Sequence, residues 1–240
     1  MNLVLDIGNT RIKVAFFNQG ELINKDKVAV SDLKAYVSGN KFDFGIISSV
    51  KSVKEINFDE LDRDKRFIFL NQNIKLPITN FYLSPNTLGN DRLANAVGAF
   101  SINPNKNNLV IDAGTCLKFD FISAENQYFG GAISPGLKMR AKALHTFTDK
   151  LPLIELLKPV DLIGNSTEAA MASGIVNGIV AEINKIIEAY SMKYKQLQVF
   201  ITGGDAEFLY PMVDKQKSSI FAHDNITLVG LNRILEENVS

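Results

Sequence analysis

Two aspartates each end a short apolar run and are followed at once by a glycine-containing turn. Asp6 follows Leu3-Val4-Leu5, and Asp112 follows Leu109-Val110-Ile111. In such a turn, backbone N–H groups and hydroxyl side chains can surround phosphate oxygens. A carboxylate beside them can hold Mg²⁺ directly or through water. The pattern indicates a nucleoside triphosphate site, although an ordinary β-hairpin explains the first turn alone equally well.

The residues offered by the two turns extend beyond the aspartates. The first segment comprises Asp6, Ile7, Gly8, Asn9, Thr10, Arg11, Ile12 and Lys13, and the second comprises Asp112, Ala113, Gly114 and Thr115. Lys13 adds positive charge, and the GxxxxGK[ST] phosphate loop is absent from the chain. A third glycine turn, Thr202-Gly203-Gly204-Asp205-Ala206, joins an expected strand to an expected helix. It would let backbone approach a nucleotide closely, or simply connect the two elements.

A different chemistry is indicated by the segment Gly89-Asn90-Asp91-Arg92, at the expected start of a helix. Arg92 can bind a carboxylate through two hydrogen bonds. Asp91 can accept a hydroxyl proton during phosphoryl transfer. The alternative is that Asp91 only caps the helix and Arg92 makes a surface ion pair.

The elements that must position these residues form an internal repeat. With one residue of gap at Asn9, the segment around Asp112 aligns with the segment around Asp6, and Lys118 becomes the counterpart of Lys13. Each copy continues into an aromatic strand, and helices follow later in each half. We therefore predict a duplicated α/β fold. A long helix is expected over Ser166–Tyr190, where Gly174 and Gly178 cost roughly 1 kcal/mol each unless another element packs closely there.

Composition excludes several classes of protein. The chain has 240 residues, with 26 basic and 26 acidic side chains, so no excess charge favours nucleic acid. The single cysteine, Cys116, cannot form an internal disulfide, and two histidines leave little for a zinc site. The first residues show no basic leader, and charge or glycine interrupts every apolar stretch short of a membrane span. We expect a soluble cytoplasmic protein without a nucleic-acid or membrane partner.

Together, the three turns resemble the two phosphate motifs and the adenosine motif of the acetate and sugar kinase, Hsp70 and actin superfamily. The resemblance implies duplicated RNase-H-like (actin-like ATPase) domains, each a mixed sheet flanked by helices, with ATP between them. We place the boundary between residues 1–107 and 108–240.

Over nearly the whole chain, the order of motifs is similar to that of type III pantothenate kinases. The motifs are DIGNT, Tyr82 before Pro85, GNDR, DAGT, GGAISPGL, Leu151-Pro152, GNST at Gly164–Thr167, and TGGDA. The family phosphorylates pantothenate with ATP, the first step towards coenzyme A. The resemblance implies that residues 6–13 and Thr115 bind ATP, with Mg²⁺ at Asp6, and that Asp91 accepts the proton. It assigns pantothenate to Tyr82, Gly89, Asn90, Asp91, Arg92 and Thr167, in a site completed by a homodimer.

The same resemblance assigns a monovalent cation, K⁺ or NH₄⁺, to Asp112, and here the chain departs from the family. Lys118 stands where a threonine is usual, and Cys116 stands where alanine is common. Strand alternation puts Lys118 and Asp120 on one face, so they could form a surface pair. Alternatively, an inward Lys118 could supply positive charge near Asp112. Two other functions stay open on this fold: a regulatory ATP-binding protein, and a kinase for another small hydroxy acid or sugar.

Overall fold

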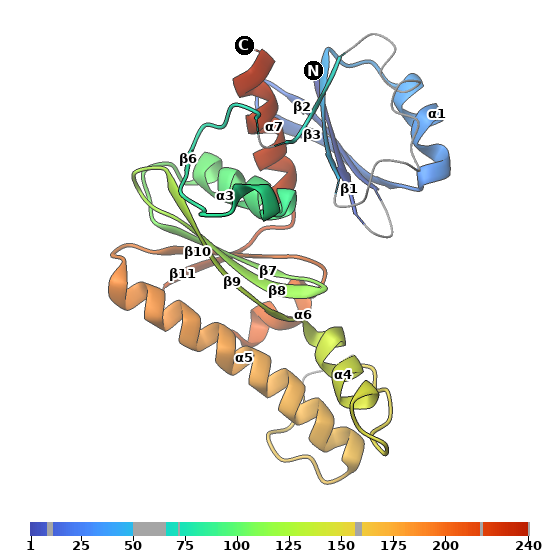
Figure 1. The fold of residues 1–240 in the computed structure, drawn as a ribbon, viewed down its shortest axis with the longest axis vertical. Helices are drawn as coiled ribbons and strands as arrows, with labels where there is room; N and C mark the ends of the chain where they lie inside the picture. Colours follow the sequence, from blue (N-terminus) through green and yellow to red (C-terminus); the bar gives the residue numbers. More distant parts are fainter. Residues whose placement is uncertain (9–11, 50–65, 72, 157–159, 217, 240) are drawn as a thin grey trace. The chain divides into compact units, whose positions relative to one another are not determined.

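The computed structural model describes residues 1–8, 12–49, 66–71, 73–156, 160–216 and 218–239 (Figure 1). Three of the expected ATP-binding residues, Asn9, Thr10 and Arg11, lie outside this range. The chain divides into two compact units. The first contains Met1–Pro104, Asn126–Tyr128 and Asn225–Ser240, and the second contains Asn105–Glu125 and Phe129–Asp224. The domain boundary that the sequence repeat predicts, between residues 107 and 108, stays a prediction.

The first unit is built on a five-stranded sheet of order β3-β2-β1-β4-β5. Its strands are β1 (Asn2–Ile7), β2 (Ile12–Asn18), β3 (Glu21–Val28), β4 (Phe44–Ser49) and β5 (Phe67–Phe69). Strand β1 is antiparallel to β2 and parallel to β4. Its central residues Leu3, Val4 and Leu5 are fully buried, as a strand covered on both faces requires.

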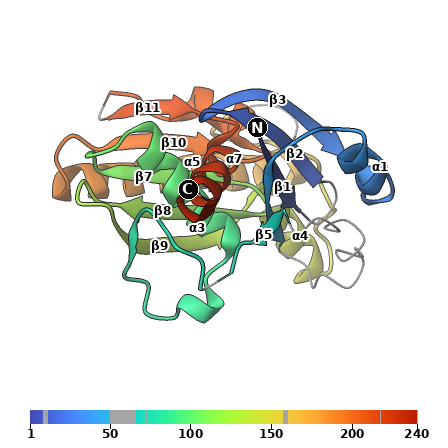
Figure 2. The same ribbon diagram turned by 90° about the horizontal axis from the view of Figure 1, so that it is seen from above.

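Helices of the first unit are α1 (Leu33–Ser38), α3 (Asn90–Ile102) and α7 (Ile226–Val239), with 3₁₀ turns at Val30–Asp32 and Pro85–Thr87. Helices α3 and α7 lie side by side in both views (Figures 1 and 2). They approach closely because glycines face the partner backbone. A Cβ atom on Gly230 would lie 1.8 Å from the Ala94 carbonyl oxygen, and one on Gly98 would lie 2.1 Å from that of Ile226.

The second unit repeats this topology. Its strands are β7 (Asn108–Ala113), β8 (Cys116–Ile122), β9 (Gln127–Pro135), β10 (Gln198–Thr202) and β11 (Ser219–Ala222). Figure 2 shows them in the order β11-β10-β7-β8-β9. Strand β7 is antiparallel to β8 and parallel to β10, as β1 is to β2 and β4. The short strand β6 (Thr79–Asn80) pairs with the first residues of β9. The duplicated α/β fold with two mixed sheets is confirmed.

Helices of the second unit are α4 (Leu137–Thr146), α5 (Thr167–Lys193) and α6 (Ala206–Leu209), followed by a 3₁₀ turn at Tyr210–Met212. Helix α5 runs along one face of the sheet (Figure 1). Its isoleucines at positions 175, 179, 183 and 187 are buried in one cluster with apolar residues of β7, β8 and β10. Among the described helices, α5 is the one long and apolar enough to cross a membrane by length and composition. A helix packed in the core of a soluble protein passes the same test.

Candidate active site

The first turn brings Asp6 opposite Lys13. The β1–β2 pairing sets Asp6 across from Lys13, and the parallel pairing with β4 sets Ser48 on the other side of Asp6. Asp6, Lys13 and Gly8 are partly exposed, whereas Ser48 is fully buried. A carboxylate is thus positioned by three strands at the point where the hairpin turns.

The second turn has the same arrangement, with Asp112 opposite Lys118 on β8 and opposite Thr202 on β10. The Lys118 ammonium lies 2.7 Å from Oδ2 of Asp112, and each side chain is 15% exposed. Lys118 therefore points to the turn. Asp120, the surface partner that strand alternation offered, is itself buried.

Three of the sequence motifs meet at this second turn. Gly203 has a φ of +98°, and a Cβ atom there would lie 2.3 Å from the Ala113 carbonyl oxygen. The same Cβ would lie 2.5 Å from Oδ1 of Asp112. A Cβ on Gly136, just before α4, would lie 2.2 Å from the Gly114 carbonyl oxygen. Only glycine fits at either position, because the backbone of each motif packs directly against the backbone of the Asp112 turn.

Two charged groups border this turn: Asp205 of the third glycine turn, and Lys138, which the sequence analysis did not single out. The Asp205 backbone N–H donates to the Ala113 carbonyl over 2.8 Å. Burial raises the pKa of the Asp205 carboxyl above its usual range, and the nearby Lys138 ammonium opposes part of that rise. Lys138 directly follows the PGL string and could have been noticed there. Thr115 is exposed, and its carbonyl accepts the Gly136 N–H over 3.2 Å.

The segment that begins α3 is more enclosed than its local sequence suggested. Gly89 is the N-cap, and its carbonyl accepts from the backbone N–H groups of Arg92 and Leu93 over 3.1 and 3.2 Å. Asp91 lies in the first turn, and its Oδ1 accepts from the Arg92 N–H over 2.9 Å. The Asn90 amide donates to the Leu70 carbonyl over 3.2 Å.

Arg92 is only 4% exposed, so the alternative of a surface ion pair for it is wrong. Its Nη1 lies 3.4 Å from the Tyr82 hydroxyl oxygen, and its Cζ lies 5.4 Å from the centre of the Tyr82 ring. Tyr82 stacks on Tyr128, with 6.3 Å between ring centroids. The structure thus brings together Tyr82 and Arg92, which are separate in the sequence.

Two further contacts fix this segment. Asn95, one turn after Asp91, accepts a buried hydrogen bond of 2.7 Å from the Thr227 hydroxyl of α7. This hydrogen bond joins α3 to α7 and gives Asn95 a structural role. The Tyr82 N–H donates to Asn80 Oδ1 over 2.9 Å, which orders the loop before α3.

Thr167 lies exposed at the first residue of α5, in the second unit. The preceding Ser166 caps the helix through its side-chain oxygen, which accepts from the Ala169 N–H over 3.2 Å. Tyr82 and Arg92 belong to the first unit, and Thr167 belongs to the second.

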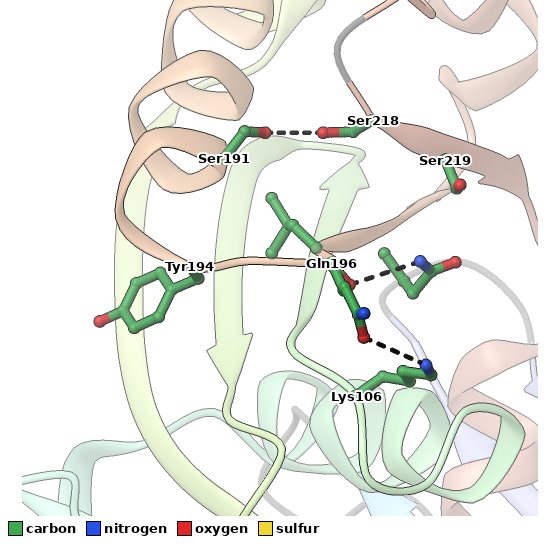
Figure 3. A pocket seen from close by; sticks show the side chains of 8 residues that line it. Lys106, Ser191, Tyr194, Gln196, Ser218 and Ser219 are labelled. Atoms are coloured by element: carbon green, nitrogen blue, oxygen red, sulfur yellow. Dashed lines mark hydrogen bonds between the residues drawn. The ribbon is translucent and has the colours of Figure 1, made fainter.

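A pocket of about 420 Å³ in the second unit is lined by none of the residues of the Asp112 turn (Figure 3). Its labelled lining residues are Lys106, Ser191, Tyr194, Gln196, Ser218 and Ser219. It lies where β10 and β11 begin, whereas Asp112 and Thr202 lie where β7 and β10 end. The Ser191 and Ser218 hydroxyls are 2.6 Å apart across it, and Lys106 donates to Gln196. This pocket is therefore distinct from the candidate phosphate site.

The described residues contain no group of three or more His, Cys, Asp or Glu side chains that could hold a metal ion. Asp6 fits Mg²⁺ nonetheless, since magnesium is commonly held by one or two carboxylates together with substrate phosphates and water. The monovalent cation expected at Asp112 does not fit in the same way, because the Lys118 ammonium already contacts Oδ2.

The fold and the paired Asp turns define the class: an α/β protein of the actin-like ATPase and sugar-kinase architecture. A glucokinase from an Antarctic psychrotroph is similar, with a TM-score of 0.54, 14% identity and 98% of each chain covered. A Campylobacter jejuni structure described as a Baf family transcriptional activator is similar with a TM-score of 0.64, 23% identity and 98% of each chain covered. At these identities the likeness shows the fold alone.

The sequence comparisons identify the family. The model of type III pantothenate kinase matches residues 2–189. A type III pantothenate kinase of Cytophaga hutchinsonii is 42% identical over 240 residues, covering 100% of both chains. One of Phocaeicola vulgatus is 43% identical over 242 residues, covering 99% of both chains. The chain belongs to the type III pantothenate kinase family.

Proposed function

We propose that this protein transfers the γ-phosphoryl group of ATP to the primary hydroxyl of pantothenate, the first step of coenzyme A biosynthesis. The sequence identity of 42% and 43% to two type III pantothenate kinases, over nearly the full length of each chain, supports this reaction. The observation that carries the substrate is the buried Arg92 beside Tyr82, directly after Asp91. A guanidinium suits an anionic substrate, because its planar N–H groups can donate two parallel hydrogen bonds to one carboxylate.

In this proposal, Asp91 accepts the proton of the pantothenate hydroxyl. The hydroxyl oxygen forms a bond to the γ-phosphorus while the bond from that phosphorus to the bridging oxygen of ADP breaks. Arg92 and Tyr82 hold the substrate, with Gly89 and Asn90 shaping the backbone at the helix start. Thr167 contacts pantothenate in a site completed across the homodimer interface. A Cβ atom on Gly89 would lie 2.6 Å from Asp91 Oδ1, so glycine leaves that carboxylate room to act.

On the nucleotide side, Asp6 and Lys13 flank the turn that receives phosphate, with Ile7, Gly8 and Ile12 supplying its backbone and Thr115 touching ATP. Asn9, Thr10 and Arg11 belong to the same proposed turn. Like other kinases, the protein uses a divalent metal with ATP, and we assign Mg²⁺ to Asp6. Mg²⁺ would neutralise charge on the phosphates during transfer. On the second turn, a positive charge beside Asp112 would balance that carboxylate.

The protein acts as a homodimer in this proposal, in the cytoplasm, and the exposed face of α5 supports the dimer. Apart from their chain neighbours and the nearby backbone of their own helix, Cβ atoms built on Gly174 and Gly178 would meet no described atom within 4 Å, so no described element packs there to offset the helix cost of these glycines. Three large apolar side chains close to α4 and α5 are also exposed: Phe147 at 85%, Leu162 at 81% and Ile163 at 83%. A second copy would bury such surface.

Alanine at position 178 tests the dimer. If α5 stays uncovered, Gly178→Ala should raise the free energy of unfolding by about 1 kcal/mol. If a partner helix approaches there, the added methyl group should instead weaken dimerisation. Light scattering and thermal unfolding of the same samples separate the two results. A fully active monomer at micromolar concentration would reject the dimer.

The function is tested by ADP release with pantothenate, with sugars, with other hydroxy acids and with no acceptor. We expect release only with pantothenate. ATP binding without turnover would favour the regulatory protein, and turnover with another acceptor would favour a different kinase. Arg92→Lys is the matched variant, because it keeps the charge but loses the two parallel hydrogen bonds. It should raise KM for pantothenate roughly tenfold or more and leave KM for ATP nearly unchanged.

A further inference from the structure

The ion pair between Lys118 and Asp112 is placed by the fold. The two residues are directly opposite in the antiparallel β7–β8 pairing, so their side chains share one face of the sheet. Both side chains are 15% exposed, and 2.7 Å separates Nζ from Oδ2. An exposed lysine would sample many rotamers, whereas this ammonium is held beside one carboxylate.

The other oxygen of Asp112 faces the glycine turn after β10. A Cβ atom on Gly203 would lie 2.5 Å from Oδ1, and one on Gly114 would lie 3.5 Å from it. The carboxylate is thus enclosed by the Lys118 ammonium on one side and by glycine backbone on the other. A second cation at this carboxylate would have to share Oδ2 with an ammonium already in contact.

We propose that the Lys118 ammonium is the resident cation of Asp112 and replaces the monovalent metal ion that the family resemblance assigns to this position. It would neutralise Asp112 beside the phosphate-binding turn, so that the carboxylate does not repel ATP. Two positive charges about 4 Å apart weaken each other's binding by roughly a thousandfold at the effective dielectric of a protein surface. Turnover should therefore proceed without potassium.

The internal repeat supports this role of Lys118, because the first unit has the same arrangement of residues. In the first unit, Lys13 takes the same register position opposite Asp6 as Lys118 takes opposite Asp112. Each aspartate is also paired on its other side with a hydroxyl residue, Ser48 or Thr202. The chain thus carries an Asp–Lys–hydroxyl arrangement twice, once at each phosphate turn.

The inference rests on the proposed kinase activity, so the test has two readouts. Initial rate is measured against potassium concentration at constant ionic strength, with tetramethylammonium as the replacing ion. The thermal unfolding midpoint of the protein without substrates is measured over the same series, since an ion that binds the folded state raises it. Wild type, Lys118→Thr and Lys118→Arg are compared, with Lys142→Thr on the exposed surface of α4 as the control.

Wild type, Lys118→Arg and Lys142→Thr should change in rate by less than about twofold over the series, with a constant midpoint, because each keeps a charge at position 118. Lys118→Thr should be activated more than about fivefold by potassium, with a rising midpoint, because the carboxylate then needs an ion. If the Lys118→Thr variant does not fold, Lys118→Gln replaces it as the variant without the ammonium group.

Activation of wild type by potassium with a matching rise in midpoint would overturn the inference. So would superimposable flat curves for wild type and Lys118→Thr. Absence of pantothenate-dependent turnover at every salt concentration would instead reject the proposed function. The midpoint series would still decide whether Lys118 replaces the ion.

Discussion

The contact between α3 and α7 makes Gly230→Ala the sharpest test of how the substrate segment is held. The added Cβ would lie 1.8 Å from the Ala94 carbonyl oxygen and 2.7 Å from the Gly98 backbone nitrogen. Both are backbone atoms, so one helix must move. Overpacking costs about 1–3 kcal/mol, and this contact belongs at the upper end. Alanine recovers about 1 kcal/mol of helix propensity, which leaves a net loss of about 2 kcal/mol.

A loss of about 2 kcal/mol corresponds to a fall in Tm of about 4–8 °C for a chain of this size. Since Asp91 and Arg92 lie in the first turn of α3, the shift should also raise KM for pantothenate more than KM for ATP. Arg233→Ala on α7 is the control: its side chain is 42% exposed and its ion-pair partners among the described residues are Glu236 and Glu237 of the same helix, so the change should cost less than about 1 kcal/mol. An unchanged Tm for Gly230→Ala, measured by calorimetry beside this control, would refute the close packing of the two helices.

Asp91→Asn should lower kcat by about 10²–10⁴-fold and leave ATP affinity largely intact, as steady-state rates and nucleotide titration would report; near-wild-type kcat would reject its role as proton acceptor. Asp6→Ala should abolish most Mg·ATP use in a folded protein, and unchanged affinity and rate would leave the first turn a structural hairpin. Asp205 binds its proton more tightly in the folded protein than in the unfolded chain, so its contribution to stability falls as pH rises above the normal carboxyl pKa. Asp205→Asn should reduce that fall in denaturant unfolding between acid and neutral pH, and parallel curves for the two proteins would contradict this.

The repeat and its main elements could be predicted from local pattern. The aligned lysines Lys13 and Lys118 do occupy the same register position in the two sheets. Helix α5 runs over Thr167–Lys193, close to the expected Ser166–Tyr190, because its isoleucines recur at helical spacing over several turns.

Features that depend on distant contacts had no local signal. Strand β11 buries only Ile220 among its four residues, so no alternation marks it, and β6 has two residues. Arg92 is buried beside Tyr82, which is ten residues away in the sequence. Tyr82 follows strand β6, and the pairing of β6 with β9 helps to position it. The pairing of α7 with α3 rests on glycines whose role appears only when both helices are in contact.

The central claim is tested most directly by incubating the purified protein with pantothenate and ATP labelled at the γ-phosphate, and analysing the products by mass spectrometry and ³¹P NMR. We predict 4′-phosphopantothenate carrying the labelled phosphoryl group, formed in equal amount to ADP and at least about a hundredfold more slowly in the Asp91→Asn variant. ADP formed without labelled phosphopantothenate, or unmodified pantothenate after full ATP turnover, would contradict the account.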